Sequence, residues 1–252
     1  MIEYKSPGEI ELMRRAGVIT AHTIERLLEA VKPGMTTAQL DELAERFILS
    51  EGATPSFKGY RGFPASICTS LNDEVVHGIP AKRRLHEGDI LKLDVGAVWK
   101  GYHGDSAVSV FVGSAPSDVA EKLIRVTEES LAAGISMLRP GGRLYDVGHA
   151  VQQVVEGAGF AVVREYVGHG VGRALHEDPQ VPNYGDPGRG PEIRAGLVVA
   201  IEPMVNVGDW RTRVLADDWT VVTRDKGLSA HFEHTVAVTD EGTEVLTARS
   251  AA

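Results

Sequence analysis

The stretch "ILKLDVGAVWKGYHGDSAVSVFV" (residues 90–112) decides the fold, because it predicts a β-hairpin with one aspartate in each strand. Its two runs are rich in Val and Leu, and the glycines of "KGYHG" indicate a turn. With a turn centred on Trp99–Lys100, Asp94 and Asp105 lie roughly opposite each other on one face. Directly opposed like charges destabilise a sheet. Either Lys92, two residues before Asp94 on the same face, forms a salt bridge, or the two acids have a function.

The composition of the chain narrows the classes of protein to which it can belong. Its 252 residues suffice for a substantial core, and a hydrophobic share of 43% is ordinary for a globular protein. A net charge of −9 argues against broad binding to nucleic-acid phosphates, so we expect no DNA partner. A single cysteine, Cys68, excludes an internal disulfide and favours a reducing compartment. With no signal peptide and no apolar run of membrane-spanning length, the chain is expected to be cytoplasmic and to contact no membrane.

Two halves of the chain repeat one pattern of helices. Helical periodicity begins with the capping box "SPGE" and ends at Pro33-Gly34, and a second amphipathic stretch then ends at Gly52. The same pair of stretches recurs later in the chain, with Pro140-Gly141 and Gly159 each 107 residues after their counterparts. The spacing indicates an internal duplication.

The repeat continues into the strands and places acids at equivalent positions. Asp94 falls on Glu202 when "ILKLDVGA" is aligned with "VVAIEPMV", and Asp105 falls on Glu233 when "DSAVSV" is aligned with "EHTVAV". We therefore predict a single domain that spans residues 1–252, with halves of about 1–115 and 116–252 facing each other across a pseudo-twofold axis. Such an axis would bring the four carboxylates together between the halves.

Four carboxylates in one buried place cannot all stay ionised without cations. Raised pKa values can keep one or two of them protonated, whereas bound metal compensates all four. Carboxylates can bridge two divalent ions, and two-metal hydrolytic sites set their ions about 3.5–4 Å apart. Oxygen ligands alone would suit Mg²⁺ or Ca²⁺, but an added imidazole favours Mn, Fe, Co or Zn. Histidine is therefore the residue to look for.

Several histidines occur in contexts that suit such a site. His169 and His176 belong to "VGHGVGRALHEDPQVPNYG", whose glycines allow a close approach of the backbone. His77 in "HGIP" stands opposite His176 in "HEDP" if the duplication extends this far, and His231 shares the face of Glu233. The other histidines are interpreted as surface, turn or outward-facing residues, namely His22, His86, His103, His149 and His234.

The combination of these residues with "HGIP", "GHGVGRALHEDP", "IEPM" and "FEHTVAV" resembles the type I methionine aminopeptidases over essentially the whole chain. The resemblance is to their short bacterial form, since only about thirty residues separate Glu202 from Glu233 and leave no room for a long helical insertion. It implies an α+β protein with the pita-bread fold, in which two pseudo-twofold-related halves of antiparallel β-sheet are flanked by helices. It also implies a monomer.

The resemblance implies a dinuclear metal site made by five residues. One divalent ion would be bound by Asp94, both ions by Asp105 and Glu233, and the other ion by His169 and Glu202. The identity of the ions, Co, Mn, Fe or Zn, does not follow from the sequence.

The activity that the resemblance implies is removal of the N-terminal methionine from nascent polypeptides with a small second residue. The enzyme would be a metallo-exopeptidase, because the free α-amine of the substrate would bind at the metals. Metal-activated water would attack the scissile carbonyl, and Glu202 would carry the proton to the leaving amine. His176 would act near the carbonyl and His77 near the scissile nitrogen, both as hydrogen-bond donors.

The same resemblance implies a pocket for the methionine side chain, bordered by the two catalytic histidines, although composition alone would make its residues ordinary core. The sequence departs from some relatives at Gly96, where they carry a hydroxyl side chain, and at Leu175, where several have Phe. His231 takes a position often held by Gln, and we hypothesise that it modulates metal affinity. The pocket residues are Tyr60, Phe63, Cys68, Leu175 and Trp219.

Three other functions stay open on the sequence. A prolidase or aminopeptidase P of the same fold would use the same five ligands, but usually with a large extra N-terminal domain and without "HGIP". A non-catalytic binding protein would tend to have lost ligands that this chain keeps. A nucleotide-binding module on "GHGVG" conflicts with the acidic balance and with Pro179 and Pro182, which leave no room for the required helix. Transient ribosome association would suit an enzyme of nascent chains, although no basic patch indicates it.

Overall fold

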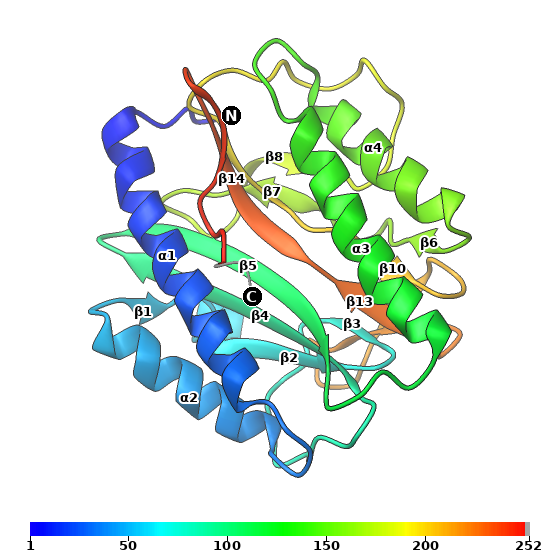
Figure 1. Ribbon diagram of the computed structural model, residues 1–252. Coiled ribbons are helices and arrows are strands. Elements are labelled where there is room, and N and C mark those ends of the chain that lie inside the picture. Colours follow the sequence, from blue (N-terminus) through cyan, green and yellow to red (C-terminus); the bar gives the residue numbers. More distant parts are fainter. Residues whose placement is uncertain (250–252) are drawn as a thin grey trace.

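The computed structural model describes residues 1–249, so the last three residues of the predicted second half lie outside the described range. Figure 1 shows the long helices and the strands that they cover. The helices are α1 (Pro7–Ala30), α2 (Thr37–Ser50), α3 (Asp118–Met137) and α4 (Leu144–Gly157), with a short 3-10 turn at Tyr60–Gly62.

The strands of the first half are β1 (Thr54–Pro55), β2 (Ile67–Leu71), β3 (Glu74–Val76), β4 (Ile90–Trp99) and β5 (Tyr102–Phe111). Those of the second half are β6 (Ala161–Val162), β7 (Gly168–Gly170), β8 (Glu177–Val181), β9 (Val198–Ile201), β10 (Met204–Asn206), β11 (Thr212–Val214), β12 (Val221–Thr223), β13 (Ser229–His231), β14 (Glu233–Thr239) and β15 (Gly242–Val245).

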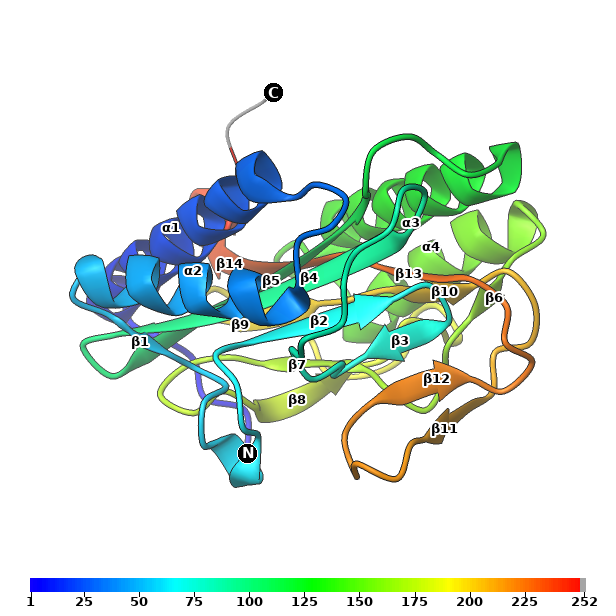
Figure 2. The same cartoon turned by 90° about the horizontal axis from the view of Figure 1, so that it is seen from below.

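One large antiparallel sheet of nine strands organises the molecule, in the order β1-β4-β5-β14-β9-β7-β8, with β2 beside β4 and β15 beside β14. Two three-stranded sheets, β13-β10-β6 and β11-β12-β3, lie next to it. Figure 2 shows that α1, α2, α3 and α4 lie on one side of the large sheet. The predicted fold class is therefore confirmed. Within residues 1–249, no helix has both the length and the apolar character that a bilayer span requires.

The first helix begins where the sequence predicts. The Glu9 carboxylate accepts a hydrogen bond of 2.9 Å from the Ser6 backbone N–H, which completes the predicted capping box, and Pro7 occupies the first helical position. The face of α1 that carries Ile19 and Ile24 is fully buried against the sheet. Burial of such a side chain contributes about 1.5–3 kcal/mol, so the apolar periodicity fixes which face of the helix packs inward.

The β4–β5 hairpin forms as predicted, but its turn lies one residue further along the chain. Lys100 and Gly101 are the central residues, with φ of 47° and 82°, as a type I′ turn requires. Asp94 consequently pairs with Ala107, and Asp105 pairs with Gly96. The two acids share one face, as predicted, but they are diagonal neighbours, two residues away from the roughly opposite position that a turn at Trp99–Lys100 predicts.

The two halves meet where β5 pairs with β14. Ala107 pairs with Asp94 on one side and with Glu233 on the other, so a small side chain separates two acids in one row. His234 pairs with Ile201, which brings Glu202 beside Glu233 at the end of β9. Strands that are far apart in the sequence thus present their acids on one face of the sheet.

Glycines at equivalent positions of the two halves have similar backbone conformations. Gly34 and Gly141, which follow the first helix of each half, have φ of 86° and 81°. Gly88 and Gly196, which precede the matching strands, have φ of 85° and 90°. Positive φ is readily adopted only by glycine, so the same turns are encoded twice. This similarity supports the duplication, and the boundaries of the halves stay a prediction.

Candidate metal centre

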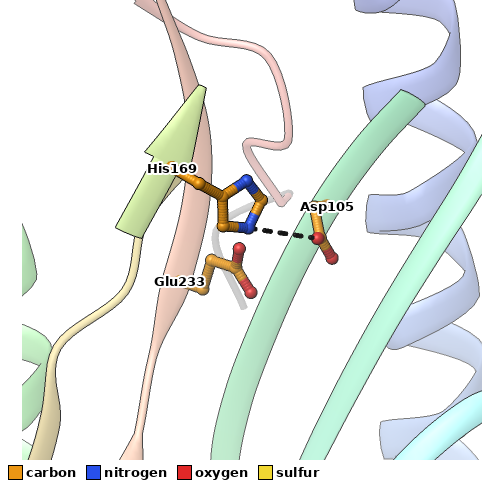
Figure 3. A group of neighbouring side chains, drawn as sticks. All are labelled: Asp105, His169 and Glu233. Atoms are coloured by element: carbon orange, nitrogen blue, oxygen red, sulfur yellow. Dashed lines mark ion pairs between the residues drawn. The ribbon is translucent and has the colours of Figure 1, made fainter. Parts of the chain in front are cut away.

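Three side chains from three strands converge on one face of the large sheet. Figure 3 shows His169 of β7 pointing toward Asp105 of β5 and Glu233 of β14. One nitrogen or oxygen atom from each of the three lies within 4.8 Å of the others. His169 Nε2 is also 3.4 Å from a Glu202 carboxylate oxygen and 4.0 Å from one of Asp105. This arrangement is a candidate site for a cation.

The imidazole of His169 is oriented as a ligand rather than as a cation. Its Nδ1 lies 2.9 Å from the Gly170 carbonyl oxygen, and a hydrogen bond from Nδ1–H leaves the Nε2 lone pair directed at the acids. Burial, reinforced by the neighbouring His176, lowers the pKa of His169 to about 3. The ring is therefore neutral, and its short distances to carboxylates are not ion pairs.

The carboxylates of this face are buried close together. Burial raises the pKa of Asp94 to about 7, and burial followed by the neighbouring acids raises those of Asp105, Glu202 and Glu233 well above their usual range. In the part of the chain that the structure describes, Asp94 Oδ1, Asp105 Oδ1 and Glu233 Oε1 are buried without a hydrogen-bond partner. Buried carboxylate oxygens without partners are costly. Divalent metal would satisfy them, so the residues present fit such an ion.

Lys92 does not compensate these acids. Its side chain is only 1% exposed, and its Nζ donates to the backbone carbonyls of Asn72 at 2.8 Å and Ser229 at 2.9 Å. Burial lowers the pKa of Lys92 to about 7. Of the two interpretations of the hairpin acids, the Lys92–Asp94 salt bridge is therefore wrong.

A cavity of about 150 Å³ opens at the candidate metal site. Every predicted site residue lines it, together with Phe57 and Arg61, which sequence reasoning missed. Both lie in "PSFKGYRGF", the aromatic segment that supplied two of the predicted pocket residues, and this proximity was the only signal for them. The predicted residues that line the cavity are Tyr60, Phe63, Cys68, His77, Asp94, Asp105, His169, Leu175, His176, Glu202, Trp219 and Glu233.

Two neutral histidines lie at this cavity. His176 Nδ1 is 2.8 Å from the Tyr60 hydroxyl, and its ring centroid is 4.1 Å from that of His169. His77 has the left-handed φ of 60°, which is uncommon outside glycine, and its ring makes T-shaped contacts with those of Tyr166 and Trp219. Burial lowers the pKa of both His77 and His176 to about 4, so both imidazoles are neutral near pH 7.

Two further histidines lie closer to the site than ordinary surface residues would. His231 is buried, and its Nε2 is 3.9 Å from a Glu202 oxygen and has no hydrogen-bond partner within residues 1–249. His103 belongs to β5, on the face of Asp105, and not to the turn that the sequence predicts for it. Its Nδ1 lies 2.9 Å from Ser56 Oγ. The interpretation of His103 as a turn residue is wrong, because the turn centres on Lys100–Gly101 and β5 begins earlier.

Position 96 has no room for a side chain. A Cβ atom at this position would lie 2.7 Å from Ser56 Cβ and 2.9 Å from a ring carbon of Phe57. Ordinary carbon–carbon contacts are about 3.5–4.0 Å. The segment that carries Phe57 into the cavity therefore occupies the space that a larger side chain at Gly96 would need.

Comparison with known proteins agrees with this geometry. Residues 11–240 match the profile of metallopeptidase family M24. A methionine aminopeptidase of Clostridium acetobutylicum is 56% identical over 248 residues, which cover 98% of this chain and 99% of that protein. The crystal structure of a methionine aminopeptidase from Thermotoga maritima has a TM-score of 0.96 at 48% identity and covers 99% of this chain and 100% of that one.

A prolidase from Pyrococcus furiosus has a TM-score of 0.79 at 21% identity, which shows a shared fold alone. This chain spans 66% of that protein.

The chain belongs to metallopeptidase family M24 and is therefore a hydrolase that uses divalent metal. The resemblance to the methionine aminopeptidases, predicted from the sequence, is confirmed over the full length of the relatives that it matches.

Proposed function

We propose that this enzyme removes the N-terminal methionine from polypeptides whose second residue is small. The observation that carries the proposal is that one cavity combines the candidate metal cluster with a wall of aromatic and sulfur-containing side chains. A cavity of about 150 Å³ is smaller than the usual pocket for a whole ligand, and it suits a single side chain. The relatives named methionine aminopeptidase support the same choice.

The metal site proposed for this activity holds two divalent ions. Asp94 would bind one ion, Asp105 and Glu233 both, and His169 with Glu202 the other. When bound, such ions lower the pKa of water and polarise a carbonyl oxygen. An imidazole among the ligands favours Co, Mn, Fe or Zn over Mg or Ca.

The proposed proton carrier is Glu202. Its carboxylate is buried beside the other acids and is only 3.4 Å from His169 Nε2. A carboxyl group whose pKa is raised toward neutrality can accept a proton from water and return it to the leaving amine. Its position at the end of β9, next to Glu233, would keep Glu202 within reach of the water and of the leaving amine.

The proposed hydrogen-bond donors are His176 and His77. Because Tyr60 OH lies 2.8 Å from His176 Nδ1, a hydrogen bond donated by the hydroxyl would leave the ring proton on Nε2. A neutral Nε2–H can then donate to the carbonyl oxygen as it gains charge. His77, which lies across the cavity against Trp219, would donate near the scissile nitrogen.

The proposed methionine pocket is lined by aromatic rings and a thiol. Phe63 meets Trp219 edge to face with centroids 5.0 Å apart, and Leu175 packs in the same cluster as Cys68. A thioether makes favourable contacts with ring edges, worth about 0.3–1.5 kcal/mol each. Burial and the nearby acids raise the pKa of Cys68 well above its usual value, so Cys68 would be a wall of the pocket and not a nucleophile.

The substrates proposed for this site are nascent chains, so the predicted compartment is the cytoplasm. The resemblance to the type I enzymes predicts a monomer. Transient ribosome association would suit this role. A prolidase is the rival that shares the fold, and a non-catalytic binding protein is the rival of another class.

Hydrolysis of Met-Ala-Ser and Ala-Pro-Ala by chelator-stripped protein, titrated with Mn²⁺, Co²⁺ and Zn²⁺, tests the proposal. We expect metal-dependent release of methionine from the first peptide only, and loss of that activity in Glu202→Gln. Cleavage before proline would favour a prolidase. Absence of hydrolysis with every metal, despite bound ions, would favour a binding protein.

A further inference from the structure

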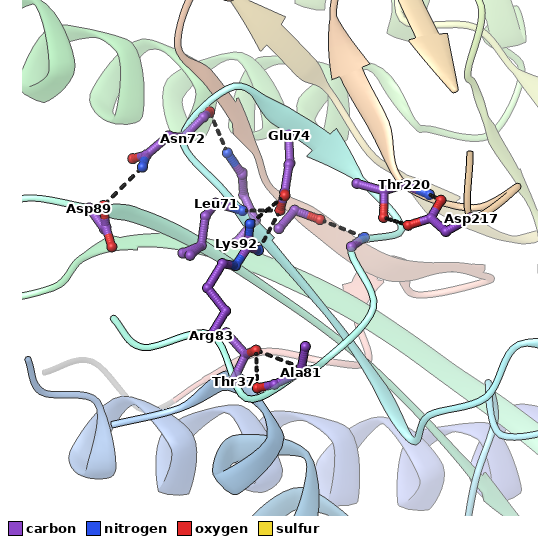
Figure 4. A network of polar contacts seen from close by, with 12 residues as sticks. Thr37, Leu71, Asn72, Glu74, Ala81, Arg83, Asp89, Lys92, Asp217 and Thr220 are labelled. Atoms are coloured by element: carbon purple, nitrogen blue, oxygen red, sulfur yellow. Dashed lines mark hydrogen bonds and ion pairs between the residues drawn. The ribbon is translucent and has the colours of Figure 1, made fainter. Parts of the chain in front are cut away.

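Lys92 is a buried lysine without an acidic partner, and on its face of the hairpin it belongs to the cross-strand pair next to that of Asp94. Lys92 and Ser109 form one cross-strand pair of the β4–β5 hairpin, and Asp94 and Ala107 form the next pair on the same face. Figure 4 shows Lys92 reaching Asn72, while Arg83 turns to Glu74. Within residues 1–249, Lys92 makes no ion pair, and its Nζ donates only to main-chain carbonyls. An ammonium group is costly to bury, so its position calls for a reason.

The pair Lys92–Ser109 holds both ends of β13. Lys92 Nζ donates to the carbonyl of Ser229, the first residue of that strand, at 2.9 Å. Ser109 Oγ donates to the carbonyl of His231, the last residue, at 2.8 Å, and it accepts from the His231 N–H at 2.9 Å. A hairpin of the first half thus binds a strand of the second half at three points.

The turn between β2 and β3 completes this junction. The Asn72 carbonyl accepts from Lys92 Nζ at 2.8 Å and from the Ser229 N–H at 3.0 Å. Asn72 has the left-handed φ of 52°, and its side chain bonds the Ile90 N–H and Asp89. The Lys92 ammonium therefore joins β4, this turn and β13.

The position of β13 matters because the strand leads directly into the site. His231, at its end, carries Nε2 3.9 Å from Glu202, and Glu233 follows after one residue. β13 has only three residues, so its own ladder with β10 offers few bonds to resist a shift. Glu233 is the first residue of β14 that pairs with β5 of the hairpin, so only the outermost pair of that ladder holds it there. A displacement of β13 would move His231 relative to Glu202 and would pull on Glu233 at this end of the ladder.

We propose that Lys92 is a positioning residue of the metal centre, which sets the place of β13, and hence of Glu233 and His231, relative to the acids of the hairpin. The inference rests on the metal site of the proposed function. It extends that function, because Lys92 lies outside the ligand set and the cavity lining.

The substitution Lys92→Met tests the inference, because it keeps the length and apolar stem of the side chain and removes the three N–H donors. In chelator-stripped protein we expect the Mn²⁺ dissociation constant, measured by isothermal titration, to rise about tenfold or more. The visible absorption of bound Co²⁺ should also change, since it reports on ligand geometry. At saturating metal, kcat for Met-Ala-Ser should fall about tenfold with KM within twofold of wild type, because the methionine pocket is untouched.

Leu40→Ala is the matched control for loss of stability. Leu40 is fully buried in α2, away from β13, and its truncation should destabilise the fold while leaving Mn²⁺ affinity and the Co²⁺ spectrum unchanged. Wild-type metal affinity and spectrum in folded Lys92→Met would overturn the inference, whatever its stability.

Ser109→Ala provides a second variant should Lys92→Met fail to fold. It releases the other end of β13, and we expect a several-fold loss of Mn²⁺ affinity, whereas unchanged affinity would overturn the inference. If wild-type protein binds Mn²⁺ but releases no methionine, the proposed function fails while the comparison of metal affinities still decides the role of Lys92.

Discussion

Gly96→Ala should destabilise this protein, although the same change in an ordinary strand would stabilise it. Glycine within a strand costs about 0.5–1 kcal/mol relative to alanine. At Gly96, however, the new Cβ would lie 2.7 Å from Ser56 Cβ, about 0.8 Å closer than an ordinary carbon–carbon contact. Overpacking of this kind costs about 1–3 kcal/mol, so the steric term exceeds the gain and the sign of the effect reverses.

The neighbours of Gly96 cannot move away freely. The Ser56 N–H donates to the Gly96 carbonyl at 2.9 Å, and Ser56 Oγ is bonded to His103. Phe57 lines the cavity, so any shift of this segment pushes a ring into the proposed methionine pocket. We therefore expect a higher KM for Met-Ala-Ser together with the loss of stability.

Urea unfolding of the metal-free protein measures the effect, as a lower midpoint at an unchanged slope. Gly8→Ala is the matched control, because nothing lies within 4 Å of its added Cβ in α1, and it should be neutral or stabilising by up to about 1 kcal/mol. Ser56→Gly removes the closest contact, so Gly96→Ala should cost less in that background. An equal cost in both backgrounds, or a stabilising Gly96→Ala, would refute the steric argument.

Three further outcomes follow from the site. The pKa of Asp94 is raised to about 7, so its carboxyl group holds a proton below that pH and must lose it before metal binds. Mn²⁺ affinity should therefore rise from pH 5 to 7. At pH 6, binding heats that do not depend on the ionisation heat of the buffer would contradict this. His231→Gln should shift the metal concentration needed for half-maximal activity, and an unchanged titration would sink the hypothesis that this residue modulates metal affinity. Tyr60→Phe removes the hydroxyl that is hydrogen-bonded to His176. Loss of such a bond costs about 0.5–1.5 kcal/mol, so kcat should fall about 2- to 10-fold. An unchanged kcat would exclude a role for that hydrogen bond.

Much of the architecture is encoded by residues that are neighbours in the chain. The capping box at Ser6, the apolar stripe of α1 and the alternation of β4 and β5 are local patterns, and local patterns decide which element forms and which face it buries. The sequence also predicts that the repeated acids share a face, because residues two apart in a strand lie on the same face wherever the strand is placed. The sequence thus sufficed for the fold class. Together with the family resemblance it also named most of the residues that line the cavity, but not Phe57 and Arg61.

What depended on tertiary structure was the partner of each side chain. The type I′ turn at Lys100–Gly101 moved the pairing by two residues and made the two acids diagonal, which only the backbone conformation of the turn determines. Lys92 donates hydrogen bonds to the carbonyls of two distant segments and not to the nearby Asp94. The reason is that β13 of the other half covers the hairpin face that Lys92 shares with Asp94. Phe57 lines the cavity because Gly96, which lies 39 residues later in the chain, leaves room for it. Contacts between distant segments have no periodicity that a sequence displays, so they emerge only when the chain has folded.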